Sequence, residues 1–476
     1  MGGNETRLAS VAYQSAAGLD SSHSRDSVTM VPRAGTGEPA EFPLLTLLGS
    51  VDRLAPDPRQ RLMPFEKTLV IGRHAPKDPE PGTARWVVQD RMISGQHACI
   101  AENDDGEWQL TDLDSRNGTI VDGVSADSPL LLRDGSLIFV GGHVALFRLA
   151  TEAQIAAIRA ELSKPLGPVA TCNPDFAMTC ATLRKLADTD GEVLLTGETG
   201  AGKEVYANGI HDVSGRKGKF VAVNCAALPR ELVESELFGY LRGAHSQATA
   251  PKTGIIEEAE GGTLFLDEIG DMAPELQTKL LRFTQDRMLT PVGGTRPRRI
   301  DVRILAATSR TAPPAAGQGG LRADLAARLG AEPIRIPPLR DRLEDLGALA
   351  GVLLSAQIKP VELLTLQALS LYAWPGNVRE LQKVLITAAA LSRGLDRIAP
   401  IHLPQAIASG PSRVRSSPAG RATRPAPTAV ELEDLIRRFE GNMLRVSREL
   451  DRKPALIYRW AKRFNLKIDD YRRKDE

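Results

Sequence analysis

The sequence has no long apolar run and almost no net charge. No stretch of the 476 residues approaches the eighteen consecutive apolar side chains of a membrane helix, and the N-terminus lacks the apolar core of a secretion signal. The 60 lysines and arginines nearly balance the 59 aspartates and glutamates. Any surface for nucleic acid must therefore be local. We expect a cytoplasmic protein without a membrane partner.

Cysteine is also scarce. The four cysteines, Cys99, Cys172, Cys180 and Cys225, do not show the spacing of a metal-ligand set. This usage predicts reduced thiols in an intracellular protein.

The length predicts about three domains. In the first half of the chain, the composition and the pattern of apolar residues change once. Residues 1–45 are rich in Gly, Ser, Asp and Thr without periodic apolar positions, which predicts a disordered N-terminus. Residues 46–150 contain short apolar alternations separated by Gly, Asp and Asn. That pattern predicts an all-β sandwich.

The second half is organised differently. Strand-like and helix-like stretches alternate over 165–340, which predicts an α/β domain, whereas 341–408 shows helical patterns only and suggests a small lid. Residues 409–428 are rich in Ser, Pro, Ala and Arg and are interpreted as a flexible linker. Residues 429–476 are expected to form a compact all-α unit.

A glycine-rich run lies between a strand-like stretch, 193–195, and a helix-like stretch, 204–210. Glycines let successive N–H groups face a phosphate, a lysine adds a point charge, and the helix N-terminus adds its dipole. The run therefore predicts an ATP-binding loop made of Gly197, Glu198, Thr199, Gly200, Ala201, Gly202, Lys203 and Glu204. Glu204 stands where a magnesium-holding Ser or Thr is usual, so the metal must be held by another residue.

An apolar strand, 263–266, ends in the acidic pair Asp267 and Glu268. A strand end of this kind delivers carboxylates beside the bound phosphates. We expect Asp267 to hold Mg²⁺ and Glu268 to polarise the attacking water.

With these motifs in place, residues 194–381 resemble the AAA+ ATPase domain of bacterial enhancer-binding proteins, the activators of sigma-54 RNA polymerase. The resemblance rests on dense matches at 220–228, 234–239, 264–271, 337–340 and 374–381. It implies ATP hydrolysis with Mg²⁺ and explains Glu204, because family members carry Glu after the phosphate-loop lysine.

The resemblance also implies roles for residues outside the two motifs. Asn224 is expected to hydrogen-bond Glu268 and switch it between idle and active positions. Thr308 corresponds to a polar sensor at a strand end, and Arg379 to a lid arginine that senses nucleotide. Arg322 and Arg328 match the arginine-finger helix, which serves a neighbour's ATP and so implies a homo-oligomeric ring.

One loop departs from the family pattern. Family members read Gly-Ala-Phe-Thr-Gly-Ala in the loop that contacts sigma-54, whereas this chain has Gly243, Ala244, His245, Ser246, Gln247 and Ala248. An apolar aromatic becomes a titratable ring, and the loss of the second glycine removes freedom from a hinge. The chain also has Ser309 where Asn is usual. These changes concern coupling to a partner more than phosphate binding.

Residues 68–146 resemble a forkhead-associated (FHA) domain, which binds phosphothreonine peptides. The matches lie at 71–73, 94–97 and 112–119. The resemblance implies a phosphothreonine site formed by Arg73, Ser94, Arg116 and Asn117, with His97 as a structural residue, and a Ser/Thr kinase as the source of the signal. The phosphothreonine belongs either to a partner or to this chain, with Thr6, Thr29, Thr36 and Thr46 as candidates.

Residues 431–466 read as three short helices that resemble a Fis-type helix-turn-helix. Thirteen Lys and Arg against ten Asp and Glu give 429–476 a modest positive charge, since 13 − 10 = +3. The DNA-binding residues expected from the last helix and its turn are Lys453, Ala455, Tyr458, Arg459 and Lys462.

Together these features predict an ATP-dependent, sigma-54-type transcription regulator gated by phosphothreonine recognition, which binds DNA upstream of promoters and remodels RNA polymerase. Two alternatives remain open. One is a sigma-54-independent DNA-binding regulator or repressor that uses ATP only for assembly. The other is a phosphopeptide-binding scaffold.

Overall fold

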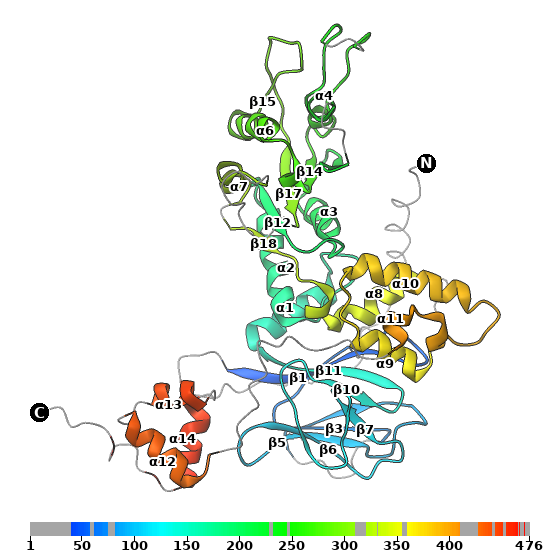
Figure 1. The fold of residues 1–476 in the computed structure, drawn as a ribbon, viewed down its shortest axis with the longest axis vertical. Coiled ribbons are helices and arrows are strands. Elements are labelled where there is room, and N and C mark those ends of the chain that lie inside the picture. The colour runs from blue at the N-terminus through cyan, green and yellow to red at the C-terminus, as the bar shows by residue number, and fades with distance from the viewer. Residues whose placement is uncertain are drawn as a thin grey trace, which may run out of the picture. The chain divides into compact units, whose positions relative to one another are not determined.

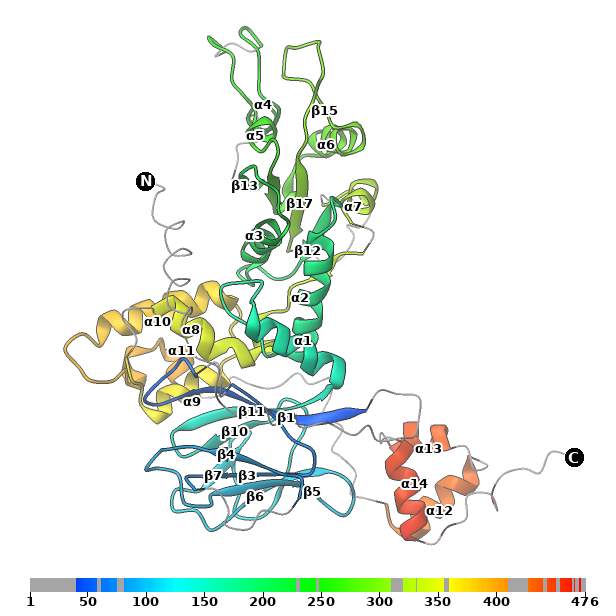
Figure 2. The same ribbon diagram turned by 180° about the vertical axis from the view of Figure 1, so that it is seen from behind.

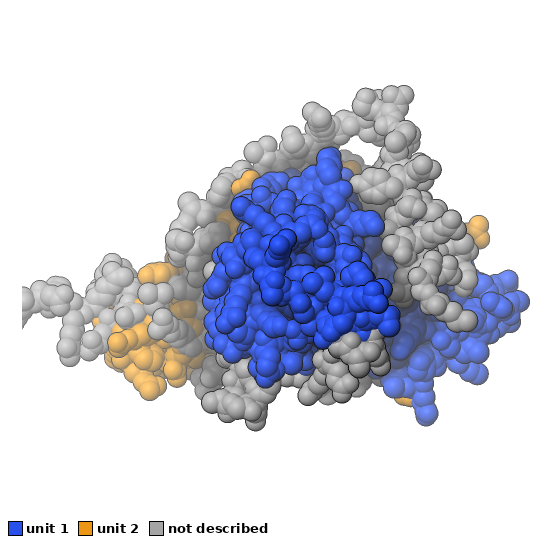
Figure 3. Space-filling view, turned by 90° about the horizontal axis from the view of Figure 1, so that it is seen from above, with its two compact units in different colours: residues 1–25, 48–61, 153–408 blue, residues 26–47, 62–152, 409–476 orange. Residues whose placement is uncertain are grey.

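The computed structural model describes most of the chain in two compact units, drawn in different colours in Figure 3. One unit contains the described residues of 48–61 and 153–408, and the other those of 26–47, 62–152 and 409–476. The described residues are 40–57, 61–74, 81–227, 232–244, 248–309, 320–330, 332–354, 359–409, 427–439, 443–450, 454–464, 466 and 471.

The predicted β-sandwich is present. A six-stranded sheet, β2-β1-β11-β10-β7-β8, and a five-stranded sheet, β4-β3-β5-β6-β9, enclose a common core that includes Leu69, Ile100, Leu110 and Phe147. The pairing is antiparallel apart from β3 with β4. The strands are β1 Glu41–Ser50, β2 Leu62–Pro64, β3 Thr68–Gly72, β4 Thr83–Val87, β5 Ala98–Glu102, β6 Trp108–Asp112, β7 Thr119–Val121, β8 Val124–Ser125, β9 Leu130–Leu131, β10 Leu137–Val140 and β11 His143–Thr151.

The predicted boundary at residue 46 is wrong, because β1 already begins at Glu41. Residues 42–49 are all buried, so this strand packs on both faces and lacks the alternation that marks a half-exposed strand. Thr46 is fully buried within it and is not accessible to a kinase in this fold. Thr6, Thr29 and Thr36 lie outside the described residues.

The predicted ATPase domain contains a parallel five-stranded sheet with helices on both faces, as Figure 1 shows. Its strand order is β13-β14-β17-β12-β18, with bounds Phe220–Asn224, Thr263–Asp267, Arg303–Thr308, Val193–Thr196 and Ile334–Arg335. Strands buried on both faces read as continuous apolar runs, which is why 264–266 and 304–307 are entirely apolar. The topology is the predicted α/β fold.

Alternate side chains of these strands enter two apolar clusters. Leu264 and Leu266 join one cluster with helices α6 (Pro274–Asp286) and α7 (Ala323–Leu329), whereas Phe265 joins the other with α2 (Pro174–Ala187) and α3 (Lys203–Val213). Seen from behind in Figure 2, α3 lies on one side of the sheet and α6 and α7 lie on the other. Smaller elements are α1 Glu152–Ser163, α4 Val233–Phe238, α5 Ile255–Glu258, η2 Ile269–Asp271, β15 Met288–Leu289 and β16 Arg298–Arg299.

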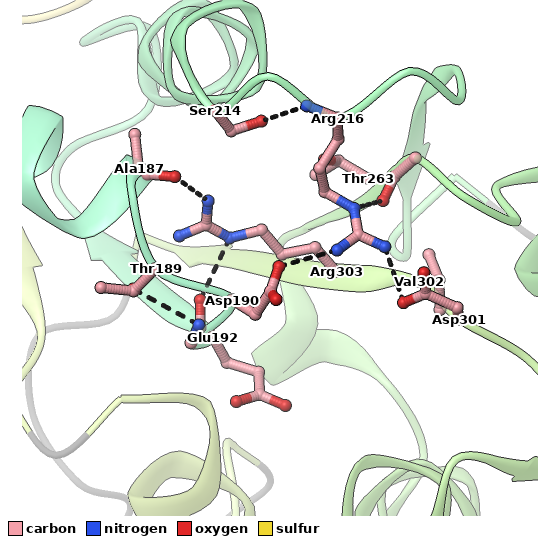
Figure 4. A network of polar contacts seen from close by, with 12 residues as sticks. Ala187, Thr189, Asp190, Glu192, Ser214, Arg216, Thr263, Asp301, Val302 and Arg303 are labelled. Carbon is pink, nitrogen blue, oxygen red and sulfur yellow. Dashed lines mark hydrogen bonds and ion pairs between the residues drawn. The ribbon is translucent and has the colours of Figure 1, made fainter.

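Two arginines connect the loops at the amino ends of the strands (Figure 4). Buried Arg303 donates to the carbonyl oxygens of Ala187 and Gly191, which lie at and beyond the end of α2. Arg216 donates to Asp190 at 2.8 Å and to Asp301 at 2.7 Å. Ligands of open α/β sheets bind at the opposite, carboxyl edge, so we assign this network a structural role.

The predicted lid is helical. It contains α8 Leu346–Leu354, α9 Leu363–Leu371, α10 Asn377–Leu391 and α11 Gln405–Ala408, with short 3-10 turns at Leu339–Asp341, Leu343–Asp345 and Pro400–His402. Trp374 is fully buried, and its indole N–H donates to the carbonyl oxygen of Leu369 at 3.0 Å. This bond fixes the turn between α9 and α10, which carries the start of α10 toward the phosphate loop.

Three C-terminal helices pack around a small core. The helices are α12 Ala429–Arg438, α13 Met443–Leu450 and α14 Pro454–Arg463, and Leu432, Val446 and Trp460 are buried among them. Pro454 opens α14, as its position predicts. The described part of the chain contains no helix with the length and apolar character needed to cross a membrane. All four cysteines are free thiols.

Candidate nucleotide site and phosphopeptide site

Parallel strands bring the predicted ATPase residues to one edge. The register pairs Asn224 with Asp267 across β13 and β14, and Thr196 with Thr308 across β12 and β17. The phosphate loop follows Thr196, so it starts at the same carboxyl edge as these residues. The structure therefore assembles segments that lie far apart in the sequence.

The phosphate loop has the conformation that its glycines predict. Gly200 and Gly202 have φ of 78° and 99°, in the left-handed region that side chains disfavour. Gly200 also allows close packing, because a Cβ there would lie 2.6 Å from the carbonyl oxygen of Gly376 in the lid. Helix α3 begins at Lys203, so its N-terminus faces the loop.

Lys203 is the centre of the site. Its side chain is buried, and Nζ donates to the carbonyl oxygens of Gly197 at 2.9 Å and Glu198 at 3.4 Å. Nζ also lies 3.5 Å from a carboxylate oxygen of Glu268. A phosphate entering the loop would meet a lysine already directed into it by these contacts.

Glu268 is held by a residue to which the sequence assigned no role. The backbone N–H and the hydroxyl of Ser309 both donate to Glu268 Oε2 at 2.9 Å. Glu268 itself has φ of 50°, a strained backbone of the kind that clusters at functional sites. The signal in the sequence was that Ser309 departs from the family pattern directly after the sensor Thr308.

The predicted bond between Asn224 and Glu268 is not the one formed in this structure. Asn224 ends β13, and its Oδ1 accepts the N–H of Ala226 at 3.0 Å, which closes a local turn. The Glu268 carboxylate is bound by Lys203 and Ser309 instead. Asn224 stays a predicted partner only for another state of the site.

Asp267 fits the predicted metal role. Its Oδ1 is buried and has no hydrogen-bond partner, and burial raises the pKa of Asp267 while the charge of Lys203 opposes the rise. A magnesium ion is usually held by one or two carboxylates together with substrate phosphates. The Asp267 oxygen without a partner could serve as a ligand of such an ion. Glu204, which replaces the usual Ser or Thr, is exposed in the first turn of α3.

The lid contacts the phosphate loop directly. Arg340 and Asn377 both bind the Glu198 carboxylate, with Nη1 of Arg340 at 2.8 Å and Nδ2 of Asn377 at 3.1 Å. The N–H of Val378 donates to the carbonyl oxygen of Gly200 at 3.0 Å. Arg379 therefore lies beside the loop, where its charge acts on Asp267, and its nucleotide-sensing role stays a prediction. We call Glu198, Arg340 and Asn377 the lid latch.

The lid latch predicts a pH dependence. Its hydrogen bonds, first that from Arg340, lower the pKa of Glu198 from its usual 4.5 to about 2. A depressed folded pKa stabilises the folded protein above 4.5, and the contribution fades as pH falls toward 2. We expect Glu198→Gln to be less stable than wild type at neutral pH, with the difference shrinking in acid. Urea unfolding of both proteins from about pH 7 to pH 3 measures it; a difference independent of pH would contradict the latch.

The two predicted finger arginines have different surroundings. Arg322 precedes α7, is exposed, and pairs with nearby Asp324 at 2.8 Å. Arg328 lies within α7 and donates through Nε and Nη2 to the carbonyl oxygen of Thr284 near the end of α6. Both arginines are exposed, but Arg328 also joins two helices of its own chain.

The predicted sigma-54 contact loop is described only at its base. The N–H of Gly243 donates to the carbonyl oxygen of Ala248 at 2.8 Å, which closes the loop ends together, and Ala244 lies against Gly293. His245, Ser246 and Gln247, the positions that depart from the family pattern, lie outside the described residues.

The predicted phosphothreonine residues gather on the loops at one end of the sandwich. The N–H of Arg73 donates to the Ser94 carbonyl at 2.9 Å, the N–H of Arg116 to the Ser94 hydroxyl at 3.1 Å, and Asn117 Nδ2 to the Met92 carbonyl at 2.7 Å. The Nε of Arg73 is buried without a partner, which leaves a donor for an incoming oxyanion.

His97 holds these loops from below. It is fully buried, its Nδ1 accepts the N–H of Ser94 at 3.1 Å, and its Nε2 lies 3.2 Å from the carbonyl oxygen of Gly118. The first bond makes Nδ1 the acceptor, so Nε2 carries the proton and donates. These contacts fit the structural role that the sequence predicted.

The predicted DNA-binding residues map to α14 and the turn before it. Tyr458 and Lys462 are exposed on α14. Ala455 and Arg459 belong to the same helix, but their side chains lie outside what the structure describes, as does Lys453. These five stay predictions.

Comparison with known proteins matches three parts of the chain to family models. A sigma-54 interaction domain matches 169–335, an AAA+ ATPase lid domain 340–419, and an FHA domain 69–141. The transcriptional regulatory protein GlrR of Escherichia coli K12 is 36% identical over 321 residues, which cover 64% of this chain and 69% of that protein. The chain belongs to the sigma-54-interacting family of transcription regulators.

Other members of the sigma-54-interacting family match a smaller share of their own length. The nitric oxide reductase transcription regulator NorR1 of Cupriavidus necator is 40% identical over 314 residues, or 60% of this chain and 61% of that protein. The regulator NtrC of Azospirillum brasilense is 48% identical, over 47% of this chain and 48% of its own. The chain thus spans about half to three fifths of such relatives. A crystal structure of NtrX from Brucella abortus with ATP has 31% identity and a TM-score of 0.46, covering 65% of this chain and 72% of that one.

Proposed function

We propose that this chain hydrolyses ATP in a homo-oligomeric ring and uses the energy to act on sigma-54 RNA polymerase. The observation that carries the proposal is the group of charged side chains at the sheet edge: Lys203 directed into an intact phosphate loop, with Glu268 bound between Lys203 and Ser309. Lys203 would bind the outer phosphates, and Glu268 would orient a water for attack. Mg²⁺, held by Asp267, would supply charge neutralisation at the phosphates.

The lid latch connects this chemistry to movement. Glu198 lies within the phosphate loop. It is bound by Arg340, in the 3-10 turn Leu339–Asp341, and by Asn377, at the start of α10. Because Glu198 belongs to the loop that would hold the phosphates, a change at the bound nucleotide would reach the lid through these bonds. In this proposal such changes would move the 243–248 loop against the polymerase.

Open-complex formation tests this output most directly. The full chain, ATP, sigma-54 RNA polymerase and candidate promoter DNA with its upstream region are combined, with Glu268→Gln as the hydrolysis control. We expect promoter opening with wild type only. ATP hydrolysis without opening would instead favour the sigma-54-independent regulator, which the substitutions at His245, Ser246 and Gln247 suggest. Restoring Phe, Thr and Gly at these positions then tests whether the loop is the cause.

The sandwich would gate this activity by binding phosphothreonine after a Ser/Thr kinase has acted. The proposal rests on Arg73, Ser94, Arg116 and Asn117, whose loops meet at one end of the sandwich. In the same proposal the three C-terminal helices bind DNA upstream of the promoter through the exposed face of α14. Binding of phosphopeptide and of DNA by the full chain tests these two roles separately.

Replacing Arg73 by Ala is expected to weaken binding of a phosphothreonine peptide by about tenfold or more, because a charge-assisted bond to the phosphate is lost. Arg85→Ala is a matched control, since Arg85 is an exposed arginine midway along the edge strand β4, where it pairs with Val70 of β3, and it belongs to none of the loops that carry the predicted site. Titration of both variants with phosphorylated and unphosphorylated peptides measures the effect. Equal binding by wild type and Arg73→Ala would show that the sandwich does not use this site.

A further inference from the structure

Residues 48–61 comprise the end of β1 and the segment that leads to β2, but they belong to the ATPase unit. Val51 and Leu54 are buried there. The carbonyl oxygen of Val51 accepts the N–H of Val361 at 2.7 Å, and Asp52 pairs with Arg397 at 2.9 Å. We call 48–61 the connector, and its described residues around Val51 and Asp52 are therefore folded against the lid.

Helix α8 is shaped for the connector. A Cβ on Gly347 would lie 1.7 Å from the carbonyl oxygen of Leu48, and a Cβ on Gly351 would lie 2.5 Å from the Cβ of Ala55. The two glycines are one helical turn apart and so share a face. Any side chain at either position would displace the connector, so its close approach is built into the lid.

Arg61 ends the connector in a buried polar group. Its guanidinium donates to the carbonyl oxygens of Ala170 at 2.7 Å and Glu344 at 3.2 Å, and lies 3.3 Å from Asp345 Oδ1. Both side chains of the ion pair are almost fully inaccessible. A buried carboxylate needs a counter-charge, and Arg61 supplies one to Asp345.

Arg342 caps the start of the 3-10 turn that ends at Asp345, whose N–H donates to the Arg342 carbonyl oxygen at 3.0 Å, and the Arg342 side chain reaches the nucleotide site. Its Nη2 donates to the carbonyl oxygen of Ala201 in the phosphate loop, and its Nη1 to the hydroxyl of Tyr206 in α3 at 3.1 Å. The guanidinium carbon lies 4.8 Å from the centre of the Phe176 ring. Arg342 thus ties the loop to the helices around it.

The positive charges of two arginines act on the buried carboxylate of Asp345. Burial raises its pKa, and the positive charges of Arg61 and Arg342 oppose that rise. Its Oδ2 and the Nε of Arg342 are both buried without hydrogen-bond partners. If Arg61 were lost, Arg342 would be the remaining counter-charge, and its guanidinium would be drawn from Ala201 toward Asp345.

We propose that Arg61 is a positioning residue for the phosphate loop, which it steadies by neutralising Asp345 and leaving Arg342 free to hold Ala201. This inference rests on the proposed function, because it assumes that the loop binds ATP. It adds that the nucleotide site depends on a residue from the connector, so that a change in the sandwich strands on either side of it has a physical route to ATP affinity.

The test compares full-length variants by titration with a non-hydrolysable ATP analogue below their melting temperatures. Arg61→Met is expected to weaken binding roughly three- to thirtyfold, the range of mutations that act through a coupled network. Arg61→Lys keeps the charge and is expected to bind almost as wild type. Arg397→Met is the matched control, since it breaks the exposed pair with Asp52 on the same connector and is expected to leave affinity unchanged.

A double variant separates positioning from a loss of stability. Arg61→Met with Asp345→Leu removes both charges, so nothing draws Arg342 away, and binding is expected to recover toward wild type. Recovery supports the inference; a double variant as weak as Arg61→Met would overturn it, as would wild-type affinity in Arg61→Met. If wild type itself bound no analogue, the proposed function would fall together with the inference.

Discussion

Replacing Glu268 by Gln is expected to lower ATP turnover by about a hundred- to ten-thousandfold, the usual contribution of a positioned general base, while ATP still binds. The amide matches the carboxylate in shape and can still accept the Ser309 bonds, but it cannot polarise a water. Lys203 keeps its bonds to the loop carbonyls. Steady-state turnover and analogue binding, measured on the same preparation, check both halves of the expectation.

Ser309→Ala serves as the companion to this variant. It removes one of the two donors to Glu268 Oε2 and leaves the backbone N–H in place. We expect a fall in turnover of about tenfold, since one hydrogen bond to a charged group contributes about 1.5 kcal/mol. Normal turnover in Glu268→Gln would show that hydrolysis does not use this carboxylate. A loss in Ser309→Ala as large as that in Glu268→Gln would show that Ser309 acts chemically.

Removing Arg322 is expected to lower turnover in the assembled ring by about a thousandfold, because an arginine supplied to a neighbour's γ-phosphate has effects of that size. The reason for choosing Arg322 lies in its surroundings. It is exposed and pairs with Asp324, an exposed residue two positions along. The Arg322 guanidinium could therefore leave Asp324 and bind a neighbour's phosphate without breaking a buried contact. Turnover of Arg322→Ala at protein concentrations that support assembly measures the loss.

Mixing inactive variants shows whether this arginine acts between subunits. A ring of Arg322→Ala and Glu268→Gln chains contains sites with an intact Glu268 beside a neighbour with an intact Arg322. Such rings are expected to regain part of the wild-type turnover. Arg328→Ala is the contrasting variant: its bonds to Thr284 lie within one chain, so we expect lowered stability without rescue. No recovery in the first mixture would argue against a shared site.

The parts of the nucleotide site that are local in sequence were predictable. A strand, a glycine run and a lysine at the start of a helix specify the phosphate loop, since the conformation of Gly200 and Gly202 follows from the backbone. The acidic pair Asp267 and Glu268 follows from one strand end in the same way. In both cases the residues that determine the local structure lie within a few positions of one another in the sequence.

The contacts between distant segments were not predictable from such patterns. Ser309 approaches Glu268 because β14 and β17 are neighbours in the sheet, and no local rule gives that order. Asn224 does not bond to Glu268 in this structure because its amide oxygen closes a turn within its own loop, so its predicted role stays a prediction. Arg340 lies in a run that matched the family without an assigned role, and its bond to Glu198 depends on how the lid folds back.

The connector has a consequence for how such proteins are recombined. The ATPase unit is discontinuous in sequence, since 48–61 folds with 153–408. A cut at the start of α1 would remove Arg61, leave Asp345 without its ion pair, and expose the glycine face of α8. Replacing the sandwich by a different domain at that point would therefore also alter the ATPase unit. A chimera with an unchanged ATPase unit has to retain the connector. Otherwise it must supply another counter-charge for Asp345 and another backbone segment that covers Gly347.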